Sequence, residues 1–161
     1  MQIPMSIKGL MMDPITNMPI VILHDPDGRR VLPIWVGVFE ANAIALQIEN
    51  VATPRPMTHD LLRNVLQELR AEVDKIVVTD LRENTFFAMI HLHVGADPLV
   101  IDARPSDAIA LALRTQAPIF VEDSVLEHAR TVEAVPDRAD DERLSKWLES
   151  LDPDDLGKYK M

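Results

Sequence analysis

The 161-residue chain contains no cysteine, which excludes disulfide bonds, thiol catalysis and cysteine-based metal sites. Glycine is scarce, with five residues, and no stretch has the Gly-rich pattern of a P-loop or of a dinucleotide-binding turn. The H-E-x-x-H and G-x-S-x-G motifs of zinc proteases and serine hydrolases are also missing. Acidic, histidine and arginine side chains therefore remain as the main groups that could carry chemistry.

Aromatic residues make up 4% of the chain, so its 47% hydrophobic content is mostly aliphatic and is ample for a core. No apolar run approaches the ~18 residues that span a membrane. The N-terminus lacks the basic start and apolar stretch of a signal peptide. We therefore expect a cytoplasmic protein with no membrane association.

A basic excess is also lacking, because the formal net charge is −10. The imbalance is uneven: residues 122–161 carry −6 and residues 1–121 only −4. Nucleic-acid-binding proteins usually present a basic surface. This composition weighs against tight non-specific binding to nucleic acids, but it leaves room for a local positive or metal-neutralised cleft.

The hydrophobic pattern predicts strands and hairpins interspersed with helices, and hence an α+β fold. We expect a mixed or antiparallel sheet with hairpins, packed against buried Ala-rich helices, in one domain over residues 1–132. For residues 133–161 we expect an acidic C-terminal helix and tail, because Leu144, Trp147 and Leu148 have helical spacing. The predicted strands cover residues 3–12, 20–23, 30–36, 73–81, 85–94, 99–101 and 119–121. The predicted helices cover residues 39–49, 58–69, 106–114 and 124–128. The second of them has the apolar stripe of an ordinary amphipathic helix, with Leu61, Leu62, Val65, Leu66 and Leu69 on its inner side.

The junction at residues 102–107 follows an apolar strand and precedes a helix that is apolar nearly all round. Ser106 is a favoured N-cap residue, which predicts that the helix starts there. Asp102 and Asp107 could converge across the turn to bind a divalent metal, or one of them could act as a base. Arg104 could hold a phosphate. The alternative is structural: Asp107 caps its own helix and Arg104 pairs with Asp102.

A second polar junction again places Arg-Pro before a helix, with Arg55 followed by Thr58 and His59. Thr58 is predicted to cap the helix, and His59 is the best acid–base candidate because imidazole titrates near neutral pH. The alternative for His59 is a solvated helix start. Glu40 heads an apolar helix, where a carboxylate is costly unless exposed or paired. It should therefore line a cleft or meet Arg55 or Arg104.

His91 and His93 occupy alternate positions of one predicted strand and so share a face. Two such histidines can ligate a metal. No third ligand is evident in the sequence, so a solvent-exposed or subunit-contact face is the favoured interpretation.

Four ordered motifs resemble the bifunctional nuclease domain family, and the similarity runs from about residue 5 to residue 125. They are Leu32-Pro33-Ile34-Trp35-Val36-Gly37, Glu40-Ala41-Asn42-Ala43-Ile44-Ala45-Leu46, Thr53-Pro54-Arg55-Pro56-Met57-Thr58-His59-Asp60-Leu61 and Asp102-Ala103-Arg104-Pro105-Ser106-Asp107-Ala108. The resemblance is to the stand-alone bacterial form. It implies an α+β fold, a wedge-shaped homodimer with a groove at its thick end, and cleavage of both RNA and DNA.

Roles for the motif residues follow from their chemistry alone. Glu40, Asp102 and Asp107 are assigned as metal ligands or base, with Mg²⁺ or Mn²⁺ as the expected ion, and His59 as acid–base. Arg55 and Arg104 are assigned as phosphate contacts. The hypothesis is that all three acids and both arginines face one groove and hydrolyse phosphodiesters with metal assistance. The alternative is a non-enzymatic dimeric module that binds a small anion or a protein partner.

Overall fold

The computed structural model describes residues 1–129 and 132–133. Its framework is one mixed eight-stranded sheet with the order β6-β5-β4-β7-β1-β2-β3-β8. This confirms the predicted α+β fold, and the strands are placed as follows. They are β1 (Gln2–Met12), β2 (Pro19–His24), β3 (Arg30–Trp35), β4 (Ala71–Arg82), β5 (Thr85–Val94), β6 (Asp97–Ala103), β7 (Ile119–Glu122) and β8 (Val132–Glu133).

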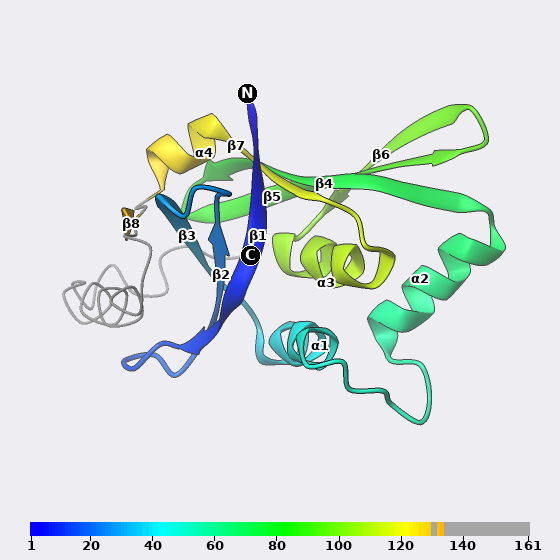
Figure 1. The fold of residues 1–161 in the computed structure, drawn as a ribbon, viewed down its shortest axis with the longest axis horizontal. Helices are drawn as coiled ribbons and strands as arrows, with labels where there is room; N and C mark the ends of the chain where they lie inside the picture. Colours follow the sequence, from blue (N-terminus) through cyan, green and yellow to red (C-terminus); the bar gives the residue numbers. More distant parts are fainter. Residues whose placement is uncertain (130–131, 134–161) are drawn as a thin grey trace.

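Strand β1 joins the two halves of the sheet. Its first residues, Gln2 to Met5, pair with β7, and the rest of the strand pairs with β2. The register shifts between Ile7 and Gly9, as at a β-bulge, which bends a strand and increases its twist. One strand can therefore serve both halves, which extend in different directions in Figure 1.

Four helices accompany the sheet: α1 (Val38–Ile48), α2 (Thr58–Glu68), α3 (Pro105–Thr115) and α4 (Asp123–His128). Helices α1, α2 and α3 lie on one side of the β4–β5–β6 half, and α4 lies by β7 (Figure 1). Helix α3 connects the edge strand β6 to β7, which pairs with β4 in parallel. Helix α3 is thus the crossover connection that leads the chain back across the sheet to β7, and it packs against β4 and β5 on the way.

Helix α3 is buried, as its sequence predicts, and eight of its residues belong to the interior. Its alanines Ala108, Ala110 and Ala112 are almost completely shielded from solvent. Small side chains let α3 approach both the sheet and α1 closely. The N-terminus of α3, where the predicted site lies, is therefore held on a rigid support.

Helix α2 differs from the sequence prediction, because none of its residues is buried. Its apolar residues Leu61, Leu62 and Val65 are exposed, as is Leu69 at its C-cap, and only Leu66 packs against the core. Helix α2 therefore stands away from the β4–β5–β6 half of the sheet rather than sealing it. Apart from Leu66, the apolar stripe of α2 is left uncovered by the rest of the described chain.

Both predicted N-caps are wrong by one or two residues. Arg104 is the N-cap of α3 because Pro105, with its fixed φ and missing N–H, takes the first helical position. Ser106 is therefore inside the helix, and its buried hydroxyl has no hydrogen-bond partner among the described residues. Helix α2 is capped at Met57 rather than Thr58, and the Asp60 carboxylate accepts the Met57 N–H at 3.0 Å.

The predicted tail helix around Trp147 lies outside the described residues. The division into residues 1–132 and 133–161 stays a prediction. Within the described segments, no helix has the length and apolar character needed to cross a lipid bilayer.

Candidate active site

A groove of about 870 Å³ opens between the N-terminal ends of α1, α2 and α3 and the β5–β6 hairpin. Its floor and walls are mostly apolar, with Leu62, Leu66, Ile90 and Leu92 among the lining residues. Polar side chains gather where the three helices begin. They are Glu40, Asn42, Thr58, His59, Asp102, Arg104 and Asp107.

Arg104 joins two of the predicted acids at this polar end. Its Nη2 donates to Glu40 Oε1 at 2.8 Å, and its Nε donates to Asp107 Oδ2 at 2.9 Å. Glu40 comes from α1, whereas Arg104 and Asp107 belong to the start of α3. The predicted partner of Glu40 is therefore Arg104. The predicted Arg104–Asp102 pair does not form, because the guanidinium is directed to the other two acids.

His59 contacts the same carboxylate from α2, with His59 Nε2 lying 2.9 Å from Asp107 Oδ1. Because an ionised carboxylate can only accept, Nε2 carries the proton in this pair. The Nδ1 atom is then an acceptor, and it bonds to no other described residue. A carboxylate that fixes an imidazole in this way is the arrangement used to orient a general base.

Two hydrogen-bond donors, His59 and Arg104, keep Asp107 ionised. Burial by itself would raise the pKa of the Asp107 carboxyl, but hydrogen bonds from His59 and Arg104 outweigh it and lower the pKa below its ordinary value. Hydrogen bonds to Asp107 and Glu40 in turn raise the pKa of Arg104. Asp107 therefore stays an anion that can hold a protonated or neutral His59, and it makes no side-chain cap for its own helix.

Gly37 makes room for this cluster. The Glu40 carboxylate lies in the space that a Cβ at position 37 would occupy. Any other residue at position 37 would displace Glu40 from its contact with Arg104. In the sequence Gly37 stands out only as the end of a motif, directly before a helix that carries an acid in its first turn.

Asp102 and Arg55, the remaining predicted site residues, are placed differently. Asp102 lines the groove but is exposed and makes no ion pair with a described residue. Arg55 lines a separate pocket on the other side of α2. The hypothesis that all three acids and both arginines face one groove is thus wrong for Arg55. The separation arises because the loop of residues 50–56 leaves α1 at its C-terminal end, away from the cluster.

Within the described part of the chain, no three histidine or acidic side chains are arranged to hold a metal ion. Arg104 occupies the position between Glu40 and Asp107 that a shared cation would need. His91 and His93 do not form such a group either. His93 lies between Asp74, at 2.7 Å, and Glu72, at 3.2 Å, and both of these acids come from the neighbouring strand β4.

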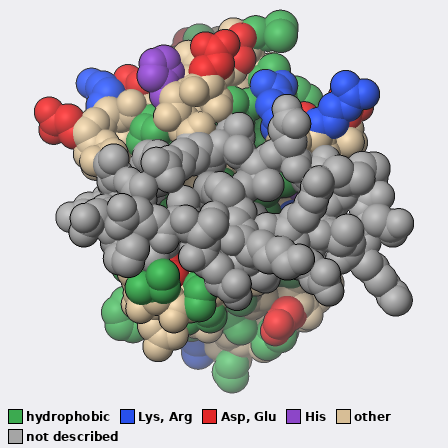
Figure 2. All heavy atoms as spheres, turned by 90° about the vertical axis from the view of Figure 1, so that its left-hand side faces the viewer, with side chains coloured by type: hydrophobic (Ala, Val, Ile, Leu, Met, Phe, Trp, Pro, Cys, Tyr) green, Lys and Arg blue, Asp and Glu red, His purple; other side chains and the backbone are tan. Residues whose placement is uncertain are grey.

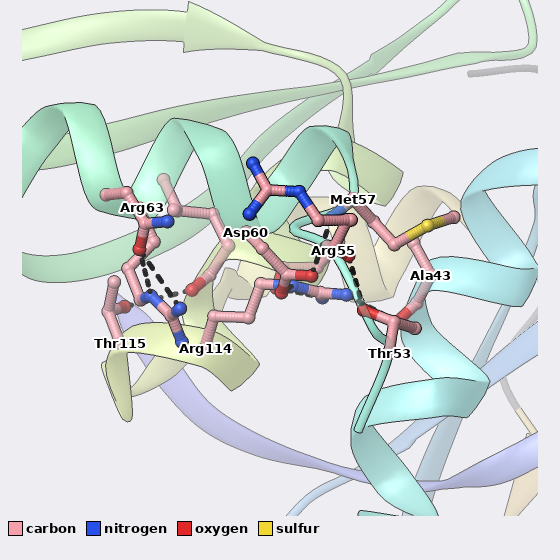
Figure 3. A network of polar contacts seen from close by, with 11 residues as sticks. Ala43, Thr53, Arg55, Met57, Asp60, Arg63, Arg114 and Thr115 are labelled. Atoms are coloured by element: carbon pink, nitrogen blue, oxygen red, sulfur yellow. Dashed lines mark hydrogen bonds and ion pairs between the residues drawn. The ribbon is translucent and has the colours of Figure 1, made fainter. Parts of the chain in front are cut away.

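A second polar network, which sequence analysis missed, anchors α2. Arg114 Nε donates to Asp60 Oδ1 at 2.7 Å, and its Nη atoms donate to the carbonyl oxygens of Ala110 and Ala43 (Figure 3). The Arg114 side chain is only 1% exposed. Burial alone would raise the pKa of Asp60, but the Met57 N–H and Arg114 outweigh it and lower that pKa. Arg114, a charged residue near the end of an otherwise apolar helix, was the sequence signal.

The visible described surface does not form one basic patch. Figure 2 shows acidic and basic side chains interspersed with apolar and other polar ones on the face it presents. On the described part of this face, positive charge is therefore gathered only locally, which agrees with the acidic composition.

Residues 21–134 match the bifunctional nuclease domain. The chain belongs to this family. The match includes all four motifs noted in the sequence, and hence Glu40, His59, Asp102, Arg104 and Asp107. The groups that meet at the polar end of the groove are thus all contributed by the bifunctional nuclease domain.

Relatives of this bifunctional nuclease domain protein include bacterial and plant chains. It is 36% identical to an uncharacterized protein of Mycobacterium tuberculosis, over 93% of this chain and 95% of the relative. It is 31% identical to bifunctional nuclease 2 of Arabidopsis thaliana and 29% to bifunctional nuclease 2 of Oryza sativa subsp. japonica. These alignments cover 63% and 66% of this chain, but only 32% and 34% of the plant proteins. The near full-length bacterial match agrees with the stand-alone form.

Proposed function

We propose that this protein is a nuclease that hydrolyses phosphodiester bonds of RNA and DNA at the polar end of the groove. The proposal rests on one observation. In this bifunctional nuclease domain, one hydrogen-bonded cluster contains Glu40, His59, Arg104 and Asp107. Family membership supports this reaction class, and the cluster supplies an oriented imidazole beside a cation.

In this proposal His59 Nδ1 takes a proton from the water that attacks phosphorus. The P–O bond to the leaving oxygen breaks, and a solvent water protonates that oxygen. Asp107 holds the ring through Nε2 and stabilises the imidazolium that forms. Arg104, which is half exposed, donates to a non-bridging phosphate oxygen as negative charge develops there. Glu40 positions Arg104 by accepting its Nη2 hydrogen.

A divalent cation is part of the proposal on grounds of charge. Glu40, Asp102 and Asp107 against Arg104 give the polar end a formal charge of −2, which repels a phosphodiester. The three carboxylates do not form a ready-made metal site. Mg²⁺ is often held by only one or two carboxylates together with substrate phosphates and water. The exposed Asp102 is the carboxylate free to take part.

The test is cleavage of labelled single-stranded RNA and DNA by the purified full chain, with Mg²⁺, Mn²⁺ or EDTA. An Asp102→Asn/Asp107→Asn variant, shown by circular dichroism to be folded, is assayed alongside. We expect cleavage that requires the cation and is lost in the variant. Equal cleavage by the variant would contradict this site, and the absence of cleavage with any cation would contradict the nuclease proposal.

We also propose that the protein is a homodimer through the apolar surface of α2 and β6. Leu99 and Ile101 of β6 are exposed on the face that their partners Leu92 and Ile90 share with the groove, and most apolar residues of α2 are exposed as well. Contiguous exposed apolar surface of this kind marks interaction sites. A second copy would cover it and would line the groove from the open side.

Sedimentation equilibrium tests this dimer. Leu62→Glu places a charge on the surface and is expected to shift the chain to monomer. Ile15→Glu, at an exposed apolar residue in the loop between β1 and β2, is the matched control and should leave the dimer intact. A monomeric unmodified chain, or a Leu62→Glu variant that remains dimeric, would contradict the proposal.

The second candidate function is a non-enzymatic dimeric binding module for a small anion or a protein partner. It is favoured by the mostly apolar lining of the groove, which a phosphodiester backbone does not need. Absence of cleavage in a folded dimer would select this candidate.

A further inference from the structure

A second pocket, of about 400 Å³, lies between the C-terminal half of α1, the loop of residues 50–56 and the first turns of α2. Three arginines, Arg55, Arg63 and Arg114, line it against a single acid, Asp60 (Figure 3). Asp60 is already paired with Arg114 at 2.7 Å. The pocket therefore has a formal excess of two positive charges, contributed by Arg55 and Arg63, in a chain of net charge −10.

The groove has the opposite sign. Its acids exceed Arg104 by two formal charges. An anionic group that is not undergoing reaction is thus drawn to the arginine pocket rather than to the groove. The two sites are separate, because Asp107 and Arg114 lie seven residues apart on α3, about 10 Å along the helix axis.

The loop that contains Arg55 fixes its backbone and leaves its guanidinium available to an anion. Pro56 restricts Arg55 to an extended backbone, and the Thr53 hydroxyl donates to the Arg55 carbonyl oxygen at 2.8 Å. The Arg55 side chain is exposed and forms no ion pair within residues 1–129. Arg63 uses Nε and Nη2 on Asn64 Oδ1, at 3.2 and 3.1 Å, which leaves Nη1 for a ligand.

The lining of the pocket is partly apolar as well as positively charged. Leu46, Val51 and Pro54 give it an apolar part beside the arginines. Its volume falls within the range of small-molecule sites, about 300–1,000 Å³. The pocket is therefore larger than a bare phosphate ion requires. This combination suits a ligand that joins a phosphate to a flat, weakly polar body.

We propose that the arginine pocket binds the phosphate monoester of a nucleotide, either free or at the end of a nucleic-acid strand. A phosphate monoester carries about −1.5 to −2 at pH 7, which matches the two unpaired guanidinium charges. An internal phosphodiester carries a single charge and matches them less well. The nucleobase or ribose packs on the apolar part of the pocket. The proposal does not depend on cleavage in the groove.

Isothermal titration calorimetry of the full chain with 5′-AMP, adenosine and inorganic phosphate tests this proposal. Arg55→Gln and Arg63→Gln are each expected to weaken 5′-AMP binding about tenfold, since each removes a charge-assisted contact. Arg29→Gln makes the same charge change at the exposed turn between β2 and β3 and is the matched control. Adenosine, which lacks the phosphate, is expected to bind at least about tenfold more weakly than 5′-AMP.

The same titration is repeated with the Asp102→Asn/Asp107→Asn variant, which should bind 5′-AMP as the unmodified chain does. The two proposals can therefore be told apart: either one can be contradicted while the other is supported. A 5′-phosphorylated oligonucleotide that binds more tightly than its 5′-hydroxyl form assigns the pocket to strand ends. Preference for free 5′-AMP assigns it to mononucleotides. Absence of 5′-AMP binding, equal weakening by Arg29→Gln, or indifference to both arginine substitutions would overturn the proposal.

Discussion

Replacing His59 with glutamine is expected to slow phosphodiester cleavage about 10²–10⁴-fold, the usual contribution of a positioned acid–base group. Glutamine retains an N–H that can donate to Asp107, so the contact between α2 and α3 is kept. Its amide cannot take a proton from water. The expected loss is therefore in kcat, with little change in KM or in the unfolding midpoint.

The matched control for this prediction is His91→Gln. His91 lies on β5 and is not among the residues that line the groove. The His91 side chain makes no hydrogen bond to another described residue, so its replacement should leave kcat unchanged. Steady-state kinetics on one labelled RNA and one labelled DNA substrate compare the three proteins. Equal rates for all three would exclude His59 from the chemistry.

Replacing Asp60 with alanine is expected to lower the free energy of unfolding by about 3–5 kcal/mol, the cost of breaking a buried ion pair from one side. Arg114 would stay almost completely buried, with its charge uncompensated. The Met57 N–H would also lose its acceptor at the start of α2. Because no residue of α2 is buried, this helix has little apolar packing to replace the lost contacts.

Urea denaturation measures this change, and an Asp60→Ala/Arg114→Met double variant isolates its cause. The double variant removes the unpaired cation and should recover part of the loss. Asp102→Ala, at an exposed acid without an ion pair to a described residue, should stay within about 0.5 kcal/mol of the unmodified chain. A loss below about 1 kcal/mol for Asp60→Ala would contradict the anchoring role of this pair.

Much of the fold follows from local sequence patterns. Residues 85–94 alternate in burial, as the alternation of Ile90 and Leu92 with His91 and His93 predicts, and the predicted strand matches β5 at both ends. The apolar run of α3 predicts its burial correctly. Helix boundaries were less predictable, because Pro105 rather than Ser106 begins α3, and a single residue's backbone preference decides such an end.

The amphipathic pattern of α2 predicted the helix correctly but not the exposure of its apolar stripe. An apolar stripe predicts that a helix covers something, but it does not say what. In α2 the stripe with Leu61 and Val65 is exposed to solvent. The helix is instead anchored to the domain by the hydrogen bond from Arg114 to Asp60, at 2.7 Å. Polar anchoring of this kind depends on the position of Arg114, 54 residues further along the chain.

By itself, the sequence determined the α+β class, the family, and which side chains could carry chemistry, because periodicity and motifs are local properties. Only the tertiary structure decided how those side chains are grouped. The crossover of α3 brings Asp107 to His59 and Glu40, residues 48 and 67 positions earlier in the chain. The loop of residues 50–56 takes Arg55 to another pocket. Both outcomes depend on how α1, α2 and α3 pack against one another, and long-range packing leaves no periodic signal in the sequence.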